Sequence, residues 1–150
     1  MKYFNAEKTM NKYIAIVTIL MLLGGRGTLL AQTEFDSLNT SSIFRDIQNG
    51  LTSGNFKSFS KHFSKQVYID LPDEESAYFS GNQVYFILQN FFGIRRLVQF
   101  KFTTIDENES GPFATGGGTF MTRGHRETLQ IYVALSNVGG RWLITQFNVY

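Results

Sequence analysis

The chain contains no cysteine in its 150 residues. This absence excludes disulfide bonds, thiol nucleophiles and a lipid-modified N-terminal cysteine. Histidine is scarce as well, because only His62 and His125 occur, and neither has a second histidine or cysteine at a spacing that would hold zinc. We therefore expect no metal and no cofactor, and the folded part of the chain must be stabilised by its hydrophobic core alone.

Concentrated positive charge is lacking once the N-terminal segment is set aside. Residues 1–31 have the pattern of a signal peptide, which starts more naturally at Met10 than at the first residue. Lys12 supplies the positive charge, residues 13–23 form a short apolar run, and Ala31 ends a cleavage region. Because this run is too short to span a bilayer comfortably, a retained membrane anchor is the less favoured alternative. We expect an exported protein, periplasmic or extracellular, with no stable membrane anchor after processing.

From residue 32 onward, 10 lysines and arginines stand against 11 aspartates and glutamates, which gives a charge of −1. Binding of nucleic acid depends on concentrated positive charge. Nucleic acid is therefore not expected as a partner. The 15 phenylalanines of the chain supply enough apolar surface for one domain with a sizeable core.

The segment from Ser80 to Gly93 carries the clearest helical pattern. Its apolar residues recur at the spacing of one helix face: Val84, Ile87, Leu88, Phe91 and Phe92. Ser80 and Gln83 have the spacing of a capping box, and Gly93 is placed for a left-handed C-cap. We expect this helix to lie across a sheet, because the chain that follows it has the pattern of β-strands.

Two shorter helices are predicted before it. Residues 32–40 are polar and predict a flexible arm, after which Ser41 or Ser42 can cap a helix that ends at residues 53–55. A second short helix through His62 is indicated by three phenylalanines at spacings of three and four: Phe56, Phe59 and Phe63.

Alternation of apolar and polar residues predicts six strands, over 67–71, 77–79, 97–106, 113–123, 127–137 and 142–149. Helices first and an antiparallel meander last are typical of an α+β fold. We expect a curved antiparallel sheet with helices packed on its concave face, in one domain over residues 41–150.

Several short sequences carry a family resemblance. The Ser-Gly-Asn ending of the first helix and the sequence Gly-Arg-Trp-Leu-Ile-Thr-Gln-Phe at 140–147 resemble the nuclear transport factor 2-like, or cystatin-like cone, superfamily. More narrowly, Tyr-Phe-Ser-Gly-Asn-Gln at 78–83, the apolar helix face that follows, and residues 117–122 with Arg126 resemble a family of secreted bacterial proteins with a domain of unknown function.

This resemblance covers residues 41–150. It implies a cone fold with a cavity and dimers formed across the sheet, and it implies no activity, because the narrower family has none assigned. Some members of the superfamily are isomerases or dehydratases that use an aspartate or histidine inside the cavity.

Asp70 is the one weak catalytic candidate for such chemistry. Burial in an apolar cavity raises the pKa of a carboxyl group and lets it act as a base near neutral pH. The sequence also allows a plainer interpretation, which we favour. In it, Asp70 and Tyr68 point to solvent while Val67, Ile69 and Leu71 fill the core.

The last strand offers candidates for a binding site. If Trp142 and Gln146 face the inside of the cone, the interior contains polar groups, and Tyr132 on the neighbouring strand and Tyr68 on the first strand can join them. A mostly apolar pocket with a few polar groups is typical of small-ligand sites. These four residues are therefore the predicted ligand-binding set. If the alternate residues of the last strand face inward, the cone is simply packed.

The glycines at 116–118 are not a phosphate-binding loop, because no Lys-Ser/Thr pair and no helix follow them. They predict a bend or bulge where the sheet curls.

These patterns favour an exported, non-catalytic module that binds a small apolar ligand or a protein partner and that can form a homodimer through the outer face of its sheet. The alternative is a small isomerase- or lyase-like enzyme that uses Asp70 as its base.

Overall fold

The computed structural model describes residues 27–108 and 110–150, with side chains from Asn39 onward. Most of the predicted signal peptide, residues 1–26, lies outside this range. Among the described residues, no helix combines the length and the apolar character that a membrane span requires. Contacts divide the chain into the units 1–36 and 37–150, and the second unit contains all six strands.

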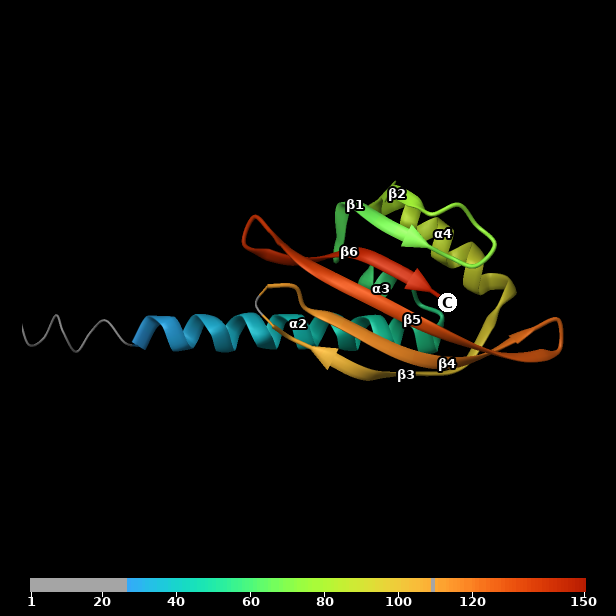
Figure 1. Ribbon diagram of the computed structural model, residues 1–150, viewed down its shortest axis with the longest axis horizontal. Coiled ribbons are helices and arrows are strands. Elements are labelled where there is room, and N and C mark those ends of the chain that lie inside the picture. Colours follow the sequence, from blue (N-terminus) through green and yellow to red (C-terminus); the bar gives the residue numbers. More distant parts are fainter. Residues whose placement is uncertain (1–26, 109) are drawn as a thin grey trace, which may run out of the picture. The chain divides into compact units, whose positions relative to one another are not determined.

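Three helices and six strands make up the described chain (Figure 1). They follow the order α2 (Gly27–Ser53), α3 (Lys57–Ser60), β1 (Phe63–Asp70), β2 (Ala77–Ser80), α4 (Gly81–Ile94), β3 (Arg96–Asp106), β4 (Phe113–Thr122), β5 (His125–Val138) and β6 (Arg141–Val149).

All six strands form one curved sheet in the order β2-β1-β6-β5-β4-β3. Every neighbouring pair is antiparallel except β1 and β6, which are parallel. The sheet is therefore mixed, whereas the sequence predicted an antiparallel sheet. Parallel pairing needs a long connection between the two strands. One helix and four strands lie between β1 and β6, and this connection lets the last strand return beside the first.

Helix α2 begins before the predicted start at Ser41 or Ser42, and residues 32–40, predicted as a flexible arm, lie within it. Neither serine is an N-cap. The Ser42 hydroxyl donates to the carbonyl oxygen of Asn39 at 2.8 Å inside the helix, and the Ser41 hydroxyl donates to Glu107. A serine can make a local backbone hydrogen bond at a helix start or within a helix, so the local pattern was ambiguous.

The predicted second helix is shorter than expected. Helix α3 ends at Ser60, before His62, and Phe63 is the first residue of β1. Its buried anchor is Phe59, whose ring meets those of Phe56 and Phe63 edge-on at centroid distances of 6.1 and 5.7 Å. The spacing of the three phenylalanines therefore reflects their packing in one aromatic cluster and not one continuous helix.

Helix α4 starts as predicted and ends differently. Both bonds of the Ser80–Gln83 capping box are present, and the predicted apolar face is buried or partly buried against the core. Gly93 is not a left-handed C-cap, because it lies inside the helix and the C-cap is Arg95 with φ −113°. The guanidinium of Arg95 lies 4.1 Å from the ring centroid of Phe91, one turn back.

The helices cover one face of the sheet, and the core fills the space between them. Phe44 of α2 meets Phe102 of β3 edge-on, with ring centroids 6.0 Å apart. Phe92 of α4 is stacked between Phe56 and Phe120, at centroid distances of 5.5 and 5.7 Å. Buried aliphatic side chains of β1, β5 and β6 complete the cluster, so the interior of the cone is packed with apolar groups.

A β-bulge in β6 reverses the alternation of the last strand. Ala134 pairs with Gln146 and the next residue, Leu135, pairs with Ile144, which leaves Thr145 as the extra residue. Trp142 and Ile144 before the bulge, and Phe147 and Val149 after it, are therefore all buried on the helix side. Neither of the two alternation sets considered from the sequence is right for the whole strand.

Candidate functional site

The sheet face that points away from the helices carries uncharged polar and aromatic side chains from five neighbouring strands. On β1, Val67 and Ile69 are buried in the core, so the alternate residue Tyr68 lies on the outer face. The strand register places Tyr68 between Tyr78 of β2 and Gln146 of β6. One row further, Asn148 of β6 lies between Asp70 of β1 and Tyr132 of β5.

Three hollows follow one another across this face. The first, of ≈570 Å³, is lined by Gln66, Tyr68, Tyr78, Ser136, Thr145 and Gln146. The central hollow, of ≈300 Å³, lies around Asn148 and Tyr132, and the glycine hollow, of ≈590 Å³, lies over Gly117 and Gly118. The first and central hollows share Gln146, and the central and glycine hollows share Gln130 and Tyr150. We call the three together the outer trough.

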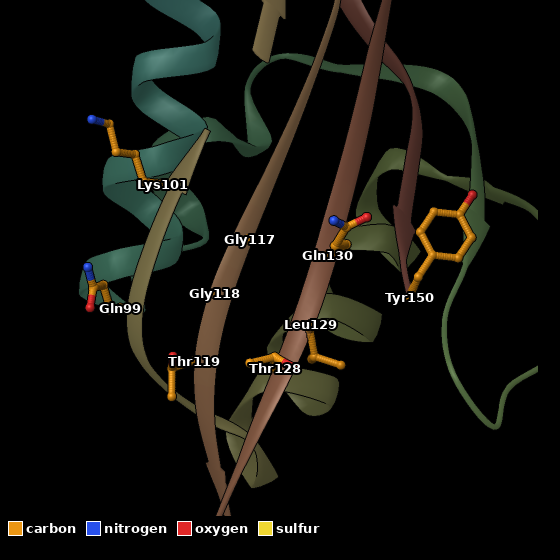
Figure 2. A pocket seen from close by; sticks show the side chains of 9 residues that line it. All are labelled: Gln99, Lys101, Gly117, Gly118, Thr119, Thr128, Leu129, Gln130 and Tyr150. Atoms are coloured by element: carbon orange, nitrogen blue, oxygen red, sulfur yellow. The ribbon is translucent and has the colours of Figure 1, made fainter. Parts of the chain in front are cut away.

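The glycine hollow exists because β4 carries no side chains there (Figure 2). A Cβ on Gly117 would meet nothing nearer than the Leu129 carbonyl oxygen at 4.0 Å, so the space above it is open. Gly116 and Gly118 face the other way, where the backbone of β3 approaches closely and shifts register on either side of the triplet. The irregularity predicted at the glycines therefore lies in β3 on either side of them, and the triplet leaves a floor of bare backbone flanked by Gln99, Lys101 and Gln130.

The central hollow contains a buried amide. Asn148 is 3% exposed, and its Nδ2 donates to the phenol oxygen of Tyr150 at 2.8 Å. Its Oδ1 is buried and accepts no hydrogen bond from any residue that the structure describes. Tyr150 itself is 61% exposed and is held through its backbone, which exchanges two hydrogen bonds with Gln130 at 2.8 and 2.9 Å.

Aromatic pairs hold the tyrosine rings of the trough in place. Tyr132 is stacked on Phe113 with ring centroids 5.8 Å apart and an interplanar angle of 27°. In the first hollow, the rings of Tyr68 and Tyr78 meet edge-on at 5.2 Å, and Tyr78 is 68% exposed. Such pairs restrict the rings and leave part of each ring accessible to a ligand.

Three of the four predicted ligand-binding residues come together in the trough: Tyr68, Tyr132 and Gln146. They lie on the outer face and not inside the cone. Trp142 does not join them, because it is 7% exposed in the core on the helix side. The predicted set did not include Asn148, Gln130 or Tyr150, although Asn148 alternates with Gln146 and Gln130 with Tyr132; the bulge at Thr145 puts Gln146 and Asn148 together on the outer face.

Asp70 also lies on the outer face of β1, because Ile69 and Leu71 on either side of it are buried in the core. Its carboxylate accepts a hydrogen bond from the Ser76 hydroxyl at 2.6 Å. None of the hollows described here is lined by Asp70. This placement agrees with the plainer interpretation, in which Asp70 is outside the core.

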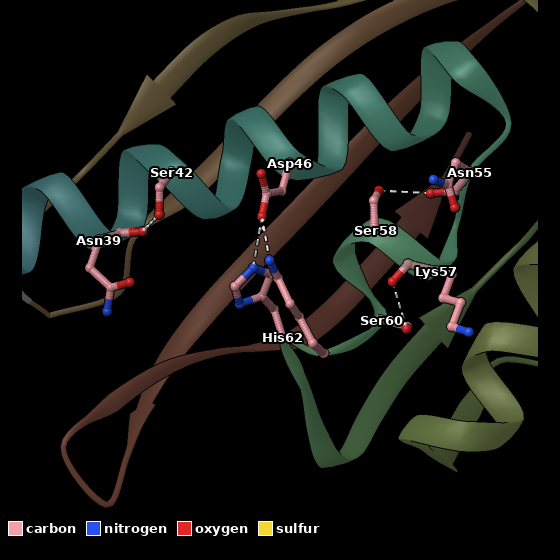
Figure 3. A network of polar contacts seen from close by, with 9 residues as sticks. Asn39, Ser42, Asp46, Asn55, Lys57, Ser58, Ser60 and His62 are labelled. Atoms are coloured by element: carbon pink, nitrogen blue, oxygen red, sulfur yellow. Dashed lines mark hydrogen bonds and ion pairs between the residues drawn. The ribbon is translucent and has the colours of Figure 1, made fainter.

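Asp46 of α2 forms ion pairs with two residues that follow α3 (Figure 3). Its Oδ2 lies 3.1 Å from both the Nζ of Lys61 and the Nε2 of His62. Burial alone would raise the pKa of the Asp46 carboxyl, but hydrogen bonds and charge attraction from His62 and Lys61 outweigh it and lower that pKa. This cluster ties α2 to the turn after α3 and is structural. Among the described residues, no group of three or more metal-ligating side chains is placed to hold an ion.

A further hollow, of ≈670 Å³, lies on the helix side between the ends of α2 and α4 and the start of β3. Its floor is apolar, from Leu51, Phe56 and Phe92, and Arg96 and Gln89 are exposed at its rim. No buried polar atom without a partner lines it, in contrast to the central hollow of the outer trough.

The order of elements and the curved sheet covered by helices on one side define a nuclear transport factor 2-like cone. A protein of this fold and of unknown function from Shewanella oneidensis MR-1 is similar, with a TM-score of 0.54 and 10% identity, covering 77% of this chain and 98% of that one. The family described as a domain of unknown function, DUF4783, matches residues 44–149. The chain belongs to this family.

Solved structures inside the family, and others whose names do not give it, share the fold at low identity. A DUF4783 protein from Bacteroides fragilis YCH46 has a TM-score of 0.58 and 16% identity, covering 69% of this chain and 93% of that one. A putative isomerase from Bacillus subtilis has a TM-score of 0.60 and 12% identity, covering 77% of this chain and 87% of that one. No curated protein matches the chain.

Proposed function

We propose that this protein is a non-catalytic binding module whose binding surface is the outer trough of its sheet. The observation that carries this proposal is the contrast between the two sheet faces. The interior of the cone is filled by packed apolar side chains, whereas the outer face has three adjoining hollows whose lining includes amide, hydroxyl and phenol groups and the ammonium group of Lys101. Concave surfaces with a few convergent polar groups and aromatic walls are typical of ligand sites.

The proposal includes export to the periplasm or the cell exterior. Its support is the N-terminal pattern of a positive charge, an apolar run and a cleavage region over residues 10–31. The small apolar ligand expected from the sequence stays a prediction, and the trough offers it tyrosine rings beside amide and hydroxyl groups.

A second copy of the chain is the competing occupant of the same surface. Tyrosine is enriched in protein interfaces, and Tyr78 and Tyr150 are exposed on this face. A dimer that covered the trough would prevent a ligand from entering it. Light scattering over a range of concentrations therefore separates the two forms of the module: a monomer leaves the trough free, and a dimer that Tyr78→Asp dissociates assigns the trough to self-association.

The test of binding is a thermal-shift screen against a metabolite panel, since a ligand that binds only the folded state must raise the melting temperature. Each hit is repeated on two matched variants, Gln146→Ala in the trough and Gln89→Ala at the helix-side hollow. The proposal expects the shift to be lost in Gln146→Ala and kept in Gln89→Ala. The opposite result would place the site on the helix side and contradict it.

The enzymatic alternative has less support from the geometry. A fold neighbour is titled a putative isomerase, but the likeness at 12% identity concerns the fold alone. A base inside the cone would need a carboxylate on the helix side of the sheet, and Asp70 lies on the other side, hydrogen-bonded to Ser76.

A further inference from the structure

The central hollow holds the strongest sign of a specific ligand. Whichever way the Asn148 amide is oriented, one of its two polar atoms bonds the Tyr150 phenol and the other is left without a partner among the described residues. A buried polar atom without a partner is unfavourable, and its persistence calls for an explanation such as a ligand. A group that both donates and accepts, as a hydroxyl does, fits either orientation of the amide.

The surroundings of Asn148 select against a charged ligand. No charged residue that the structure describes lines the hollow. Besides Ile131, its lining residues are uncharged and polar: Thr115, Gln130, Tyr132, Gln146, Asn148 and Tyr150. A carboxylate, phosphate or ammonium group entering this hollow would lose water without gaining an opposite charge from its lining, because Asp70, across the strand from Asn148, and Lys101, in the glycine hollow, do not line it. Neutral hydroxyl groups, by contrast, match amide and phenol side chains one for one.

The shape of the site indicates a ring. The hollow has a volume of ≈300 Å³, and Tyr132, held by its stacking on Phe113, presents a fixed aromatic surface in it. A saturated, hydroxyl-bearing ring in a chair form can place its C–H face against a tyrosine and its hydroxyls towards amides. Tyr150 is 61% exposed and its phenol accepts a hydrogen bond from the Asn148 amide, so a ligand hydroxyl that binds this amide lies beside that phenol.

The neighbouring hollows indicate that the ligand has more than one ring. The first hollow repeats the combination of tyrosines and amides, with Tyr68, Tyr78 and Gln66, and shares Gln146 with the central one. The glycine hollow continues the line on the other side through Gln130. A ligand built from similar units would contact similar groups at each step.

We propose, on the basis of the proposed binding function, that the outer trough binds a neutral oligosaccharide, with one sugar ring in the central hollow against Asn148 and Tyr132. A polypeptide is less suited to this surface. Peptides bind to sheets by adding a strand at an edge or by inserting apolar side chains into pockets. The central hollow lies over the middle strands β4, β5 and β6, away from the sheet edges, and most of its lining residues carry an amide, hydroxyl or phenol group.

The experiment uses the full chain on an array of neutral and acidic oligosaccharides, followed by calorimetry with the neutral hexasaccharide that binds best. We expect binding of a neutral oligosaccharide, and a shift of the Asn148 side-chain amide resonances on titration. The near-isosteric Asn148→Leu should weaken the affinity at least tenfold, and Tyr132→Leu more than Tyr132→Phe, because phenylalanine keeps the ring surface. Asn90→Leu, on the exposed side of α4, is the matched control and should leave the affinity unchanged. Circular dichroism and melting temperature verify that each variant is folded.

Two results would overturn the sugar assignment. One is the absence of any neutral glycan that binds, and the other is an affinity that Asn148→Leu and Asn90→Leu change equally. If an extended peptide or a second copy of the chain shifts the trough resonances instead, the ligand class is wrong while the proposed binding function stands. If every ligand found acts through the helix-side hollow, both proposals fail.

Discussion

The side chain of Gln48 in α2 accepts a hydrogen bond from the backbone N–H of Phe102 in β3, with 2.9 Å between Oε1 and N. β3 is an edge strand, and its pairing with β4 shifts register after Phe102. An edge strand exposes backbone groups that can pair with other chains. The helix therefore satisfies one such group and fixes its own position against the edge.

We predict that Gln48→Leu lowers the free energy of unfolding by about 1–3 kcal/mol, because the Phe102 amide loses its acceptor in a part-buried place. Gln48→Glu keeps an acceptor oxygen and should cost less. Denaturant unfolding measures both, with Asn49→Ala on the exposed side of the same helix as control. Equal losses in Gln48→Leu and Asn49→Ala would show that the bond contributes nothing.

The Asp46 cluster makes part of the stability depend on pH. The pKa of the folded Asp46 carboxyl lies below its ordinary value of 3.8, so its contribution is present above that value and is lost as the pH falls through the folded pKa. Asp46→Asn should therefore destabilise the protein at about pH 6, and the difference from the wild type should shrink towards about pH 2.

The magnitude at neutral pH should be modest, because the Asp46 side chain is 35% exposed and water screens its ion pairs. Urea unfolding of both proteins across the pH range measures the effect. Glu75→Gln, in the exposed loop before β2, serves as the control and should show no such pH dependence. A difference between Asp46→Asn and the wild type that stays constant with pH would contradict the assignment.

The glycine triplet of β4 permits a test with two adjacent positions. A Cβ at Gly116 would collide with the backbone of β3, at the Lys101 carbonyl oxygen and at 2.7 Å from the Cα of Phe102. Gly116→Ala should therefore destabilise by about 1–3 kcal/mol, as overpacked positions do. Gly117→Ala faces the open trough and should be close to neutral or slightly stabilising.

Thermal unfolding of the two variants gives the comparison directly. If Gly116→Ala and Gly117→Ala lose similar stability, the cause is the backbone flexibility of glycine in this strand and not close packing against β3. Gly117→Leu adds a second readout, because a bulky side chain there fills the glycine hollow and should weaken any ligand that extends into it.

The β4–β5 hairpin contains a strained residue. Arg123 has φ 50° and Gly124 has φ 87°, so both residues of the two-residue turn are in the left-handed region. Asn-Gly is the preferred sequence for such a turn. Arg123→Asn should raise the free energy of unfolding by about 0.5–1 kcal/mol, since arginine pays more than asparagine for positive φ.

The control for this prediction is the β5–β6 hairpin, where Gly139 and Gly140 already satisfy the same requirement with φ 62° and 79°. Gly139→Ala should lower the melting temperature there. If Arg123→Asn leaves the melting temperature unchanged or lowers it, the turn strain has no energetic importance.

Much of the fold could be predicted because its signals are local. The Ser80–Gln83 capping box and the apolar face of α4 lie within a few residues of one another, and both are confirmed. The strand positions follow from alternation, and the two-residue turns from Gly124 and from Gly139-Gly140. The predicted start of α2 was wrong because Ser42 makes a local backbone bond in the helix interior that resembles a cap, while Ser41 bonds the distant Glu107.

The candidate site was predicted only in part, because the extra residue Thr145 in β6 could not be recognised from the sequence. Strict alternation along β6 keeps Trp142 and Gln146 on the same face, but Thr145 is inserted as a bulge between them. Trp142 therefore packs in the core, while Gln146 joins Tyr68 and Tyr132 outside.

The sequence by itself determined the helix and strand types, the turns and the need for a cysteine-free apolar core, because these depend on contacts between near neighbours. Only the tertiary structure decided which sheet face is open, that β1 and β6 run parallel, and that Asn148 meets Tyr150 and Tyr132. Those outcomes depend on how strands far apart in the chain align, and a single bulge is enough to turn every later side chain to the opposite face.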